Sequence, residues 1–128
     1  MYAFFSVSAG AMLGANLRFW VSLWATQRLG GTFPYGTLIV NVVGCFLAGL
    51  FYGFAGQRVA VAPELKLFFV VGFLGAFTTF STFGYDSLAL LRNQSWTLLA
   101  FNLASNNLLG LLAVWGGLML ARSFIPLR

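Results

Sequence analysis

Residues 72–84 read Gly72-Phe73-Leu74-Gly75-Ala76-Phe77-Thr78-Thr79-Phe80-Ser81-Thr82-Phe83-Gly84, and they lie inside a longer apolar segment. This stretch combines three glycines with four hydroxyl side chains. Glycine costs backbone entropy in a helix, and Ser and Thr hydroxyls compete for backbone hydrogen bonds. We therefore predict a membrane-spanning helix that is interrupted near residues 75–79. Such an interruption is tolerated at membrane depth only where the freed backbone is buried in protein or lines a cavity.

The composition of the whole chain supports a membrane location. Of its 128 residues, 60% are hydrophobic, 18% are aromatic and 7% are charged. A soluble domain has about 45–50% apolar and about 25% charged residues. Seven basic and two acidic residues are too few to cover the surface of a soluble fold. The composition therefore excludes a soluble domain, and its hydrophobicity excludes a disordered chain.

Four segments are long and apolar enough to cross a bilayer, since a spanning helix needs about 20 mostly apolar residues. They are residues 3–25, 35–55, 65–91 and 96–120. The first lacks the basic start of a signal peptide, so we expect it to belong to the mature protein. Ser95 is expected to cap the fourth helix. The prediction is one all-α membrane domain over residues 1–128, with four transmembrane helices and the third helix broken in mid-membrane.

Basic residues divide almost evenly between the two sides of a four-span chain. One side has Arg58, Lys66, Arg122 and Arg128, and the other has Arg28 and Arg92, with Arg18 if it reaches the surface. A fixed topology with a weak positive-inside bias is one interpretation. The other is insertion in both orientations, with two opposed copies pairing as inverted repeats do. The basic residues are scattered rather than clustered, so nucleic acid is not an expected partner.

Small and polar residues form stripes at helical spacing on three of the segments. The stripes are Ser6, Gly10, Gly14 and Arg18; Thr37, Asn41, Gly44 and Ala48; and Asn102, Asn106, Gly110, Ala113 and Gly117. Such stripes allow close helix packing, with Asn as an interhelical hydrogen-bonding group. They also fit a polar interior that lines a path for a solute. Both interpretations stay open on these residues alone.

Phe80 and Phe83 are three residues apart, on one face of the helix that follows the predicted break. An aromatic ring has a negative face and a positive edge, so ring edges favour an anion. Neutral Asn, Ser and Thr donors suit conduction, because an ion must enter readily and still leave. The exposed carbonyls of a broken helix coordinate cations in transporters. The alternatives are phenylalanines that face lipid and a kink whose backbone groups are satisfied internally.

Several kinds of chemistry are excluded by the residues that the chain lacks. It has no His and a single cysteine, Cys45, which excludes His-based catalysis, His-ligated metals and an intrachain disulfide. Its two acidic residues are Glu64, in a predicted loop, and Asp86, toward the end of the third span. A proton-coupled carrier usually needs an ionisable residue deep in a span. Because no carboxylate pair, phosphate-binding loop or nucleophile motif is present in the sequence, we predict that the protein is not an enzyme.

Three motifs together resemble those of one family. They are Gly10-x-x-x-Gly14-x-x-x-Arg18, Gly36-Thr37-Leu38-x-x-Asn41-x-x-Gly44-x-Phe46-x-x-Gly49, and Gly72-Phe73-Leu74-Gly75-x-x-Thr78-Thr79-Phe80-Ser81-Thr82-Phe83. In these motifs the chain is similar to the Fluc family of fluoride channels, also called CrcB-type fluoride exporters. The resemblance implies a fluoride-selective channel that exports fluoride passively across the bacterial inner membrane and lowers cytoplasmic fluoride. It also implies an antiparallel, dual-topology homodimer with two pores.

The resemblance further implies roles for individual residues. The expected pore residues are Phe80, Phe83, Asn41, Thr37, Ser81, Thr82 and Asn106. A structural sodium ion at the dimer centre is expected on the backbone carbonyls of Gly75 and Thr78. Arg18 is expected either to attract anions into an aqueous vestibule or to anchor the first helix at the interface. Relatives commonly have Ser where this chain has Asn106, and often Glu where it has Asp86.

Two other functions stay open. A small dual-topology multidrug or cation transporter also uses four helices, but it depends on a glutamate in its first span, and this first span has none. A non-transporting membrane assembly subunit would use its asparagines only for helix packing. Ion flux through the reconstituted protein distinguishes the three possibilities.

Overall fold

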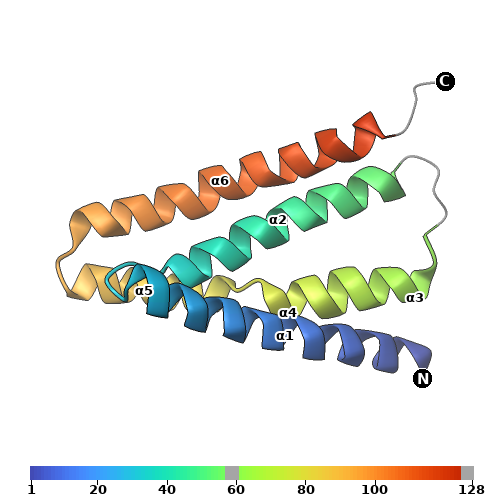
Figure 1. The fold of residues 1–128 in the computed structure, drawn as a ribbon, viewed down its shortest axis with the longest axis horizontal. Helices are drawn as coiled ribbons and strands as arrows, with labels where there is room; N and C mark the ends of the chain where they lie inside the picture. Colours follow the sequence, from blue (N-terminus) through green and yellow to red (C-terminus); the bar gives the residue numbers. More distant parts are fainter. Residues whose placement is uncertain (57–60, 125–128) are drawn as a thin grey trace.

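A computed structural model describes residues 1–56 and 61–124, and every regular element in this part of the chain is helical (Figure 1). The longest helices are α1 (Tyr2–Leu29), α2 (Tyr35–Ala55) and α6 (Trp96–Ser123). Between α2 and α6 the chain forms α3 (Pro63–Lys66), the π-helical segment η1 (Leu67–Leu74), α4 (Gly75–Phe77) and α5 (Phe80–Arg92). The all-helical prediction is confirmed, although the sequence did not predict the π-helical hydrogen bonding of η1.

Among the described residues, three helical segments are long and apolar enough to cross a membrane: α2, the run from α3 through α5, and α6. They correspond to the predicted spans 35–55, 65–91 and 96–120. Helix α1 has 28 residues, as many as α6. It carries Asn16 and Arg18 near its middle, which makes it less apolar. The membrane crossing of α1 therefore stays a prediction.

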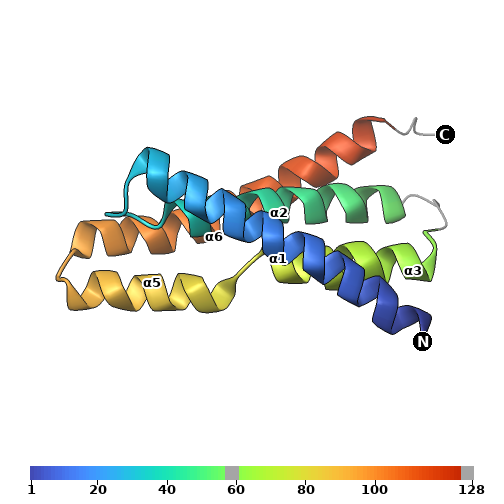
Figure 2. The ribbon, with the colours of Figure 1, turned by 60° about the horizontal axis from the view of Figure 1, so that its bottom comes forward.

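The run from α3 to α5 is interrupted at Thr78 and Thr79, inside the predicted 75–79 window. Thr78 has φ −85° and ψ 159°, and Thr79 has φ −151° and ψ 111°, so both residues are extended. Figure 2 shows this interruption as a straight linker between α4 and α5. The Thr79 hydroxyl accepts a hydrogen bond from the Thr82 amide at 3.2 Å and so caps α5. The predicted break is confirmed, and its two extended residues are threonines.

The prediction that Ser95 caps the fourth helix is correct in position and wrong in mechanism. Helix α6 begins at Trp96, directly after Ser95. The Ser95 side chain makes no capping bond to that helix, and its hydroxyl instead donates to the Asn93 carbonyl at 3.5 Å. The turn Arg92–Ser95 bends the chain back through the left-handed Gln94, with φ 56°, and this bend directs the hydroxyl toward the turn.

The helices pair through the small-residue stripes. Helix α2 lies along α6, and α1 lies along η1 and α4 (Figure 1). At Gly117 of α6 the backbone of α2 comes so close that an added Cβ would overlap the Phe46 carbonyl. At Gly10 of α1 an added Cβ would overlap the Phe68 carbonyl. The interpretation of the stripes as close-packing surfaces is therefore confirmed for these pairs.

Gly117→Ala is expected to destabilise the protein, because its new methyl group must push the α2 backbone away. Overpacking of this kind costs about 1–3 kcal/mol, and it lowers the midpoint of thermal unfolding by about 4 °C or more. Gly116→Ala is the matched control, because nothing lies within 4 Å of a Cβ at that neighbouring position. Thermal unfolding of both purified variants in detergent checks the prediction. Equal midpoints for the two variants would contradict it.

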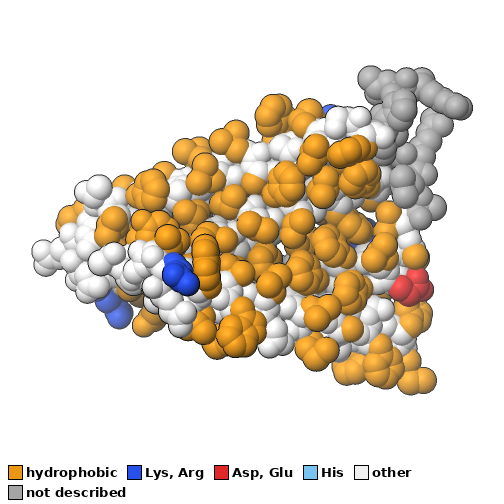
Figure 3. Space-filling model, viewed as in Figure 1, with side chains coloured by type: hydrophobic (Ala, Val, Ile, Leu, Met, Phe, Trp, Pro, Cys, Tyr) orange, Lys and Arg blue, Asp and Glu red, His pale blue; other side chains and the backbone are white. Residues whose placement is uncertain are grey.

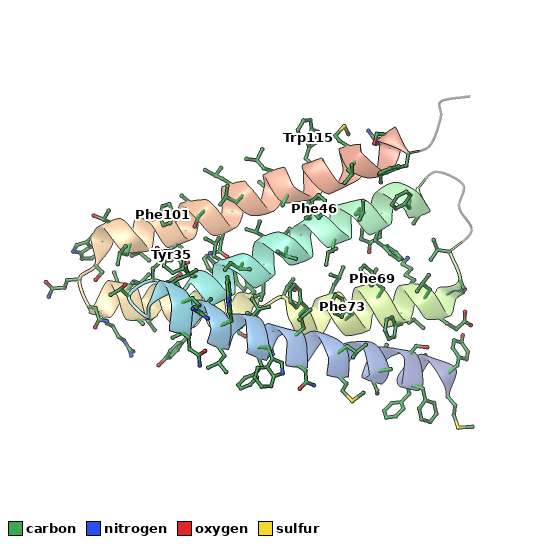
Figure 4. All side chains as sticks on the ribbon, viewed as in Figure 1. Tyr35, Phe46, Phe69, Phe73, Phe101 and Trp115 are labelled. Carbon is green, nitrogen blue, oxygen red and sulfur yellow. The ribbon has the colours of Figure 1, made fainter. Side chains whose placement is uncertain are left out.

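On the face shown in Figure 3 the surface is mostly hydrophobic, and charged side chains are few. Large apolar side chains are exposed along the lengths of α1 and α6, including Phe19, Trp20 and Leu111. Trp115 of α6 points away from the bundle in Figure 4 and is 62% exposed. A surface of this kind contacts lipid or another protein chain rather than water. The protein is therefore a multi-pass membrane protein.

Four phenylalanine rings form a continuous stack that ends at the break. Phe51 of α2 stacks on Phe69, Phe69 on Phe73, and Phe73 on Phe77, with ring centroids 5.3, 5.5 and 5.5 Å apart. Figure 4 shows Phe69 and Phe73 on the side of η1 that faces α2. Phe77 is buried and directly precedes the extended Thr78. Aromatic packing therefore holds the helix against α2 up to the residue where it ends.

Candidate functional site

A pocket of about 450 Å³ lies beside the helix break. Helices α2, α5 and α6, together with η1, α4 and the extended linker, supply its walls. We call it the break pocket, and its lining comprises Asn41, Gly44, Cys45, Ala48, Val70, Leu74, Gly75, Thr78, Thr79, Phe80, Phe83, Asn106, Asn107 and Val114. None of these described residues carries a formal charge. Six of the residues predicted for the pore or the sodium site therefore share one uncharged cavity: Phe80, Phe83, Asn41, Asn106, Gly75 and Thr78.

A second pocket, of about 350 Å³, lies between the α1–α2 turn and α5. We call it the Asp86 pocket. Thr37 and Thr82 line it, and the Thr37 hydroxyl donates to Asp86 Oδ2 at 2.7 Å. Thr37 and Thr82 therefore line the Asp86 pocket and not the break pocket. Asp86 is the single acidic residue within the predicted spans. Two predicted residues, Arg18 and Ser81, line neither of these pockets, and the vestibule role of Arg18 stays a prediction.

Phe80 and Phe83 are neighbours but differ strongly in burial. Their ring centroids are 5.6 Å apart, with 48° between the ring planes. Phe83 is 7% exposed, whereas Phe80 is 83% exposed. Both line the break pocket. One wall of this pocket is therefore the Phe80 ring, most of which is not covered by any other residue of this chain.

Asn41 joins α2 to the extended linker. Its Oδ1 accepts a hydrogen bond from the Thr79 amide at 2.8 Å, and its Nδ2 donates to the Thr79 carbonyl at 3.2 Å. The side-chain amide thus pairs with the linker as a neighbouring strand would. The same Nδ2 also donates to Asn106 Oδ1 at 3.0 Å. Asn41 therefore holds the broken backbone and contacts α6 at the same time.

The break leaves particular backbone carbonyls without their helical partners. In a continuous helix the Thr79 amide would bond the Gly75 carbonyl, and the Thr82 amide would bond the Thr78 carbonyl. Here the Thr79 amide bonds Asn41, and the Thr82 amide bonds the Thr79 hydroxyl. The Gly75 and Thr78 carbonyls have therefore lost the amides that would bond them in a continuous helix, because side chains accept from those amides instead. These are the two carbonyls that the family resemblance implies as sodium ligands.

Two polar residues that the sequence did not assign to the pore extend this arrangement, Asn102 and Ser87. Asn106 Nδ2 donates to Asn102 Oδ1 at 3.0 Å, Asn102 Nδ2 donates to Ser87 Oγ at 3.0 Å, and the Ser87 hydroxyl donates to the Phe83 carbonyl at 2.7 Å. Asn102 is fully buried. Its spacing of four from Asn106 was visible as part of a stripe, but Ser87 belongs to no sequence pattern.

The donor set of the site suits neutral hydrogen bonding and weak cation binding by oxygen. Across residues 1–56 and 61–124, no group of three His, Cys, Asp or Glu side chains comes together to hold a metal. A cation in the break region would therefore rely on backbone carbonyl and hydroxyl oxygens. Such oxygens suit alkali ions at the unwound helices of transporters.

Comparison with known proteins identifies relatives over nearly the whole chain. A protein named fluoride-specific ion channel FluC from Trichormus variabilis is 45% identical over 118 residues, which cover 91% of this chain and 86% of the relative. Proteins of the same name from Chloroflexus aurantiacus and Rhizobium meliloti are 42% and 45% identical, each over 93% of this chain and 94% and 95% of their own.

The family model for CrcB-like protein, Camphor Resistance (CrcB), matches residues 5–118. This range includes all three motifs on which the sequence resemblance depends. It also includes every residue that lines the break pocket. The chain therefore belongs to the CrcB family.

Proposed function

We propose that the protein is a fluoride-selective ion channel that exports fluoride passively and so lowers its cytoplasmic concentration. The observation that carries this proposal is the break pocket, an uncharged cavity in which Phe80, Phe83, Asn41 and Asn106 come together. The names of the relatives, which specify fluoride channels, support it. A channel is not an enzyme, and the site contains no nucleophile–base pair among the described residues that line it.

The pocket suits a small anion for electrostatic reasons. The edges of the Phe80 and Phe83 rings carry partial positive charge and can face an anion without the strong hold of an arginine. Asparagine amides add neutral hydrogen-bond donors. An ion in such a site replaces part of its hydration and still leaves, as conduction requires. Ser81 and Thr82 on α5 and Thr37 on α2 continue this polar path toward the Asp86 pocket, and Arg18 attracts anions to an aqueous mouth.

The functional unit that we propose is an antiparallel, dual-topology homodimer with two pores, formed by four-span subunits in the bacterial inner membrane. The 83% exposure of Phe80 supports this assembly, because a second chain would cover the ring and complete the pocket wall. Gly75, beside the break, is also exposed. The almost even division of basic residues is compatible with insertion in both orientations.

A structural sodium ion at the dimer centre is the cofactor that we propose. The Gly75 and Thr78 carbonyls would hold it, since side chains divert the amides that would otherwise bond them. Its charge would also make the surrounding potential more favourable to an anion.

Removal of sodium is expected to destabilise the purified protein. A site that is held at about 100 times its Kd contributes about 2.7 kcal/mol, which is lost when the ion is removed. Dialysis into N-methylglucamine buffer of matched ionic strength should therefore lower the midpoint of thermal unfolding, and added sodium should restore it. A midpoint that does not respond to sodium would contradict the proposed ion site.

Flux from liposomes tests the proposed function. Purified protein is reconstituted into liposomes loaded with potassium fluoride, and valinomycin then allows potassium to leave with the anion. The expected result is rapid fluoride efflux that is absent from protein-free liposomes, with no comparable efflux of chloride. Equal chloride flux would overturn fluoride selectivity. Drug uptake driven by a proton gradient would favour the small multidrug transporter, and an absence of any flux would favour a membrane assembly subunit.

A further inference from the structure

Both extended residues of the break are held by one face of α2. Asn41 bonds the backbone of Thr79, through its Oδ1 at 2.8 Å and its Nδ2 at 3.2 Å. Gly44 lies three residues further along α2, and the Thr78 methyl group Cγ2 occupies the space that a side chain at position 44 would fill. Residues three apart share a helix face. Helix α2 therefore contacts Thr79 through hydrogen bonds and Thr78 through close packing.

The Thr78 side chain cannot make room for a larger residue at position 44 by rotating. Its hydroxyl donates to the Leu74 carbonyl at 2.9 Å, and this bond fixes the direction of the methyl group. The order of the substituents on Cβ leaves two other staggered positions. One of them turns the hydroxyl onto Gly44, and the other turns the methyl group onto the Leu74 carbonyl. A side chain at position 44 must therefore push the backbone of the linker away from α2.

The Thr78 carbonyl belongs to the peptide unit that these contacts hold. The Thr78–Thr79 peptide is trans, so its C=O and its N–H point in opposite directions. The N–H of this unit points to Asn41 on α2. The Thr78 carbonyl therefore points away from α2. A displacement of the linker from α2 would move this carbonyl, which is one of the two proposed sodium ligands.

We propose that Gly44 is a positioning residue of the sodium site. Because it leaves room for the Thr78 methyl group, the linker lies close enough to α2 for Asn41 to bond it, and the Thr78 carbonyl is placed to hold the ion. This inference rests on the sodium ion of the proposed function. Gly44 lines the break pocket but has no side chain that could bind an ion, so it acts through the position of Thr78.

Gly44→Ala is expected to weaken sodium binding about tenfold, the size of one weakened contact between an ion and an oxygen. The midpoint of thermal unfolding is measured in detergent over a series of sodium chloride concentrations, balanced with N-methylglucamine chloride. The rise of the midpoint with sodium gives the Kd.

Two glycines of α6 supply the controls. Gly116→Ala has nothing within 4 Å of its new Cβ and should bind sodium as the wild type does. The new Cβ of Gly117→Ala overlaps the α2 backbone at Phe46. This variant should therefore lower the unfolding midpoint without changing the sodium Kd, which separates a loss of packing from a loss of the ion site.

Thr78→Ser should restore sodium binding to the Gly44→Ala protein. Serine keeps the hydroxyl that bonds Leu74 and removes the methyl group. The nearest atoms to a Cβ at position 44 are then Phe77 Cδ1 at 3.5 Å and the Cβ of residue 78 at 3.6 Å, which are ordinary contact distances. Thr78→Ser alone completes the double-mutant cycle. If Gly44→Ala does not fold, recovery of a folded, sodium-responsive protein by Thr78→Ser supports the inference, and failure to recover it overturns the inference.

The inference is overturned if Gly44→Ala and Gly116→Ala bind sodium equally, or if Gly117→Ala weakens sodium binding as much as Gly44→Ala does. It is also overturned if Thr78→Ser does not improve sodium binding by the Gly44→Ala protein. A wild-type midpoint that does not respond to sodium overturns this inference together with the proposed sodium site. A wild-type protein that responds to sodium but carries no fluoride overturns the proposed channel function alone.

Discussion

Asn41→Asp is expected to abolish fluoride flux, with a fall of at least about 100-fold. Aspartate places a negative charge in the uncharged break pocket and replaces the donor Nδ2 by an oxygen. Like charges about 4 Å apart repel by on the order of 4 kcal/mol at an effective dielectric of about 20. That repulsion alone exceeds the free energy of a 100-fold change in rate. Fluoride efflux from liposomes measures the loss.

The fold should survive this substitution, which makes the result informative. Aspartate retains an oxygen for the Thr79 amide, from which Asn41 Oδ1 now accepts at 2.8 Å, so the extended linker keeps this contact with α2 while the Thr79 carbonyl and Asn106 Oδ1 lose the Nδ2 donor. Asn16→Asp is the control, because Asn16 is an exposed amide on α1 that donates to the Met12 carbonyl. Both variants should elute from a sizing column as the wild type does. Wild-type flux through the Asn41→Asp protein would remove Asn41 from the ion path.

Phe80→Ile is expected to reduce fluoride flux about tenfold or more while leaving the subunit's own fold intact. Isoleucine keeps an apolar side chain but removes the positive ring edge, and the loss of about 1.4 kcal/mol of favourable interaction corresponds to a factor of ten. Phe80 is 83% exposed, so its replacement costs this subunit little packing. The same liposome assay measures the change in flux.

Phe4→Ile is the matched control for this variant. Phe4 is 71% exposed, lies on α1 and lines neither pocket, so its replacement should not change flux. Crosslinking in the membrane then separates two reasons for a loss at Phe80. If Phe80→Ile protein crosslinks as a dimer like the wild type, the ring acts on the ion. Flux equal to that of Phe4→Ile would show that the Phe80 ring is not part of the path.

Much of the fold could be predicted from local sequence properties. The long apolar segments, the polar turns between them and the threonine-rich stretch each act through interactions within a few residues. The break is the clearest example, because Thr79 caps the next helix with its own hydroxyl, only three residues away. The failed cap at Ser95 shows the limit of this reasoning. The residue type was suitable, but the left-handed Gln94 in the preceding turn directs its hydroxyl elsewhere.

The candidate site was predicted less completely, because its contacts join distant parts of the chain. Asn41 and Asn106 were expected near a path, but their mutual hydrogen bond spans 65 residues of sequence. Thr37 was expected on a polar track beside them, and its hydroxyl bonds Asp86, 49 residues away, in the Asp86 pocket. Residue type indicated that these side chains need partners inside a membrane. It did not indicate which partners they have.

The sequence by itself determined that this chain is helical, belongs in a membrane and breaks its third apolar segment near residues 75–79, since composition and short-range hydrogen bonding decide those features. Only the tertiary structure decided which way each amide faces. Asn106 turns its oxygen toward Asn41 because Asn41, oriented by the Thr79 amide, presents its Nδ2 there, while the Asn106 Nδ2 donates to the backbone carbonyl and Oδ1 of Asn102. The direction of a hydrogen bond depends on what lies at both of its ends, and here those ends meet only after the helices have packed.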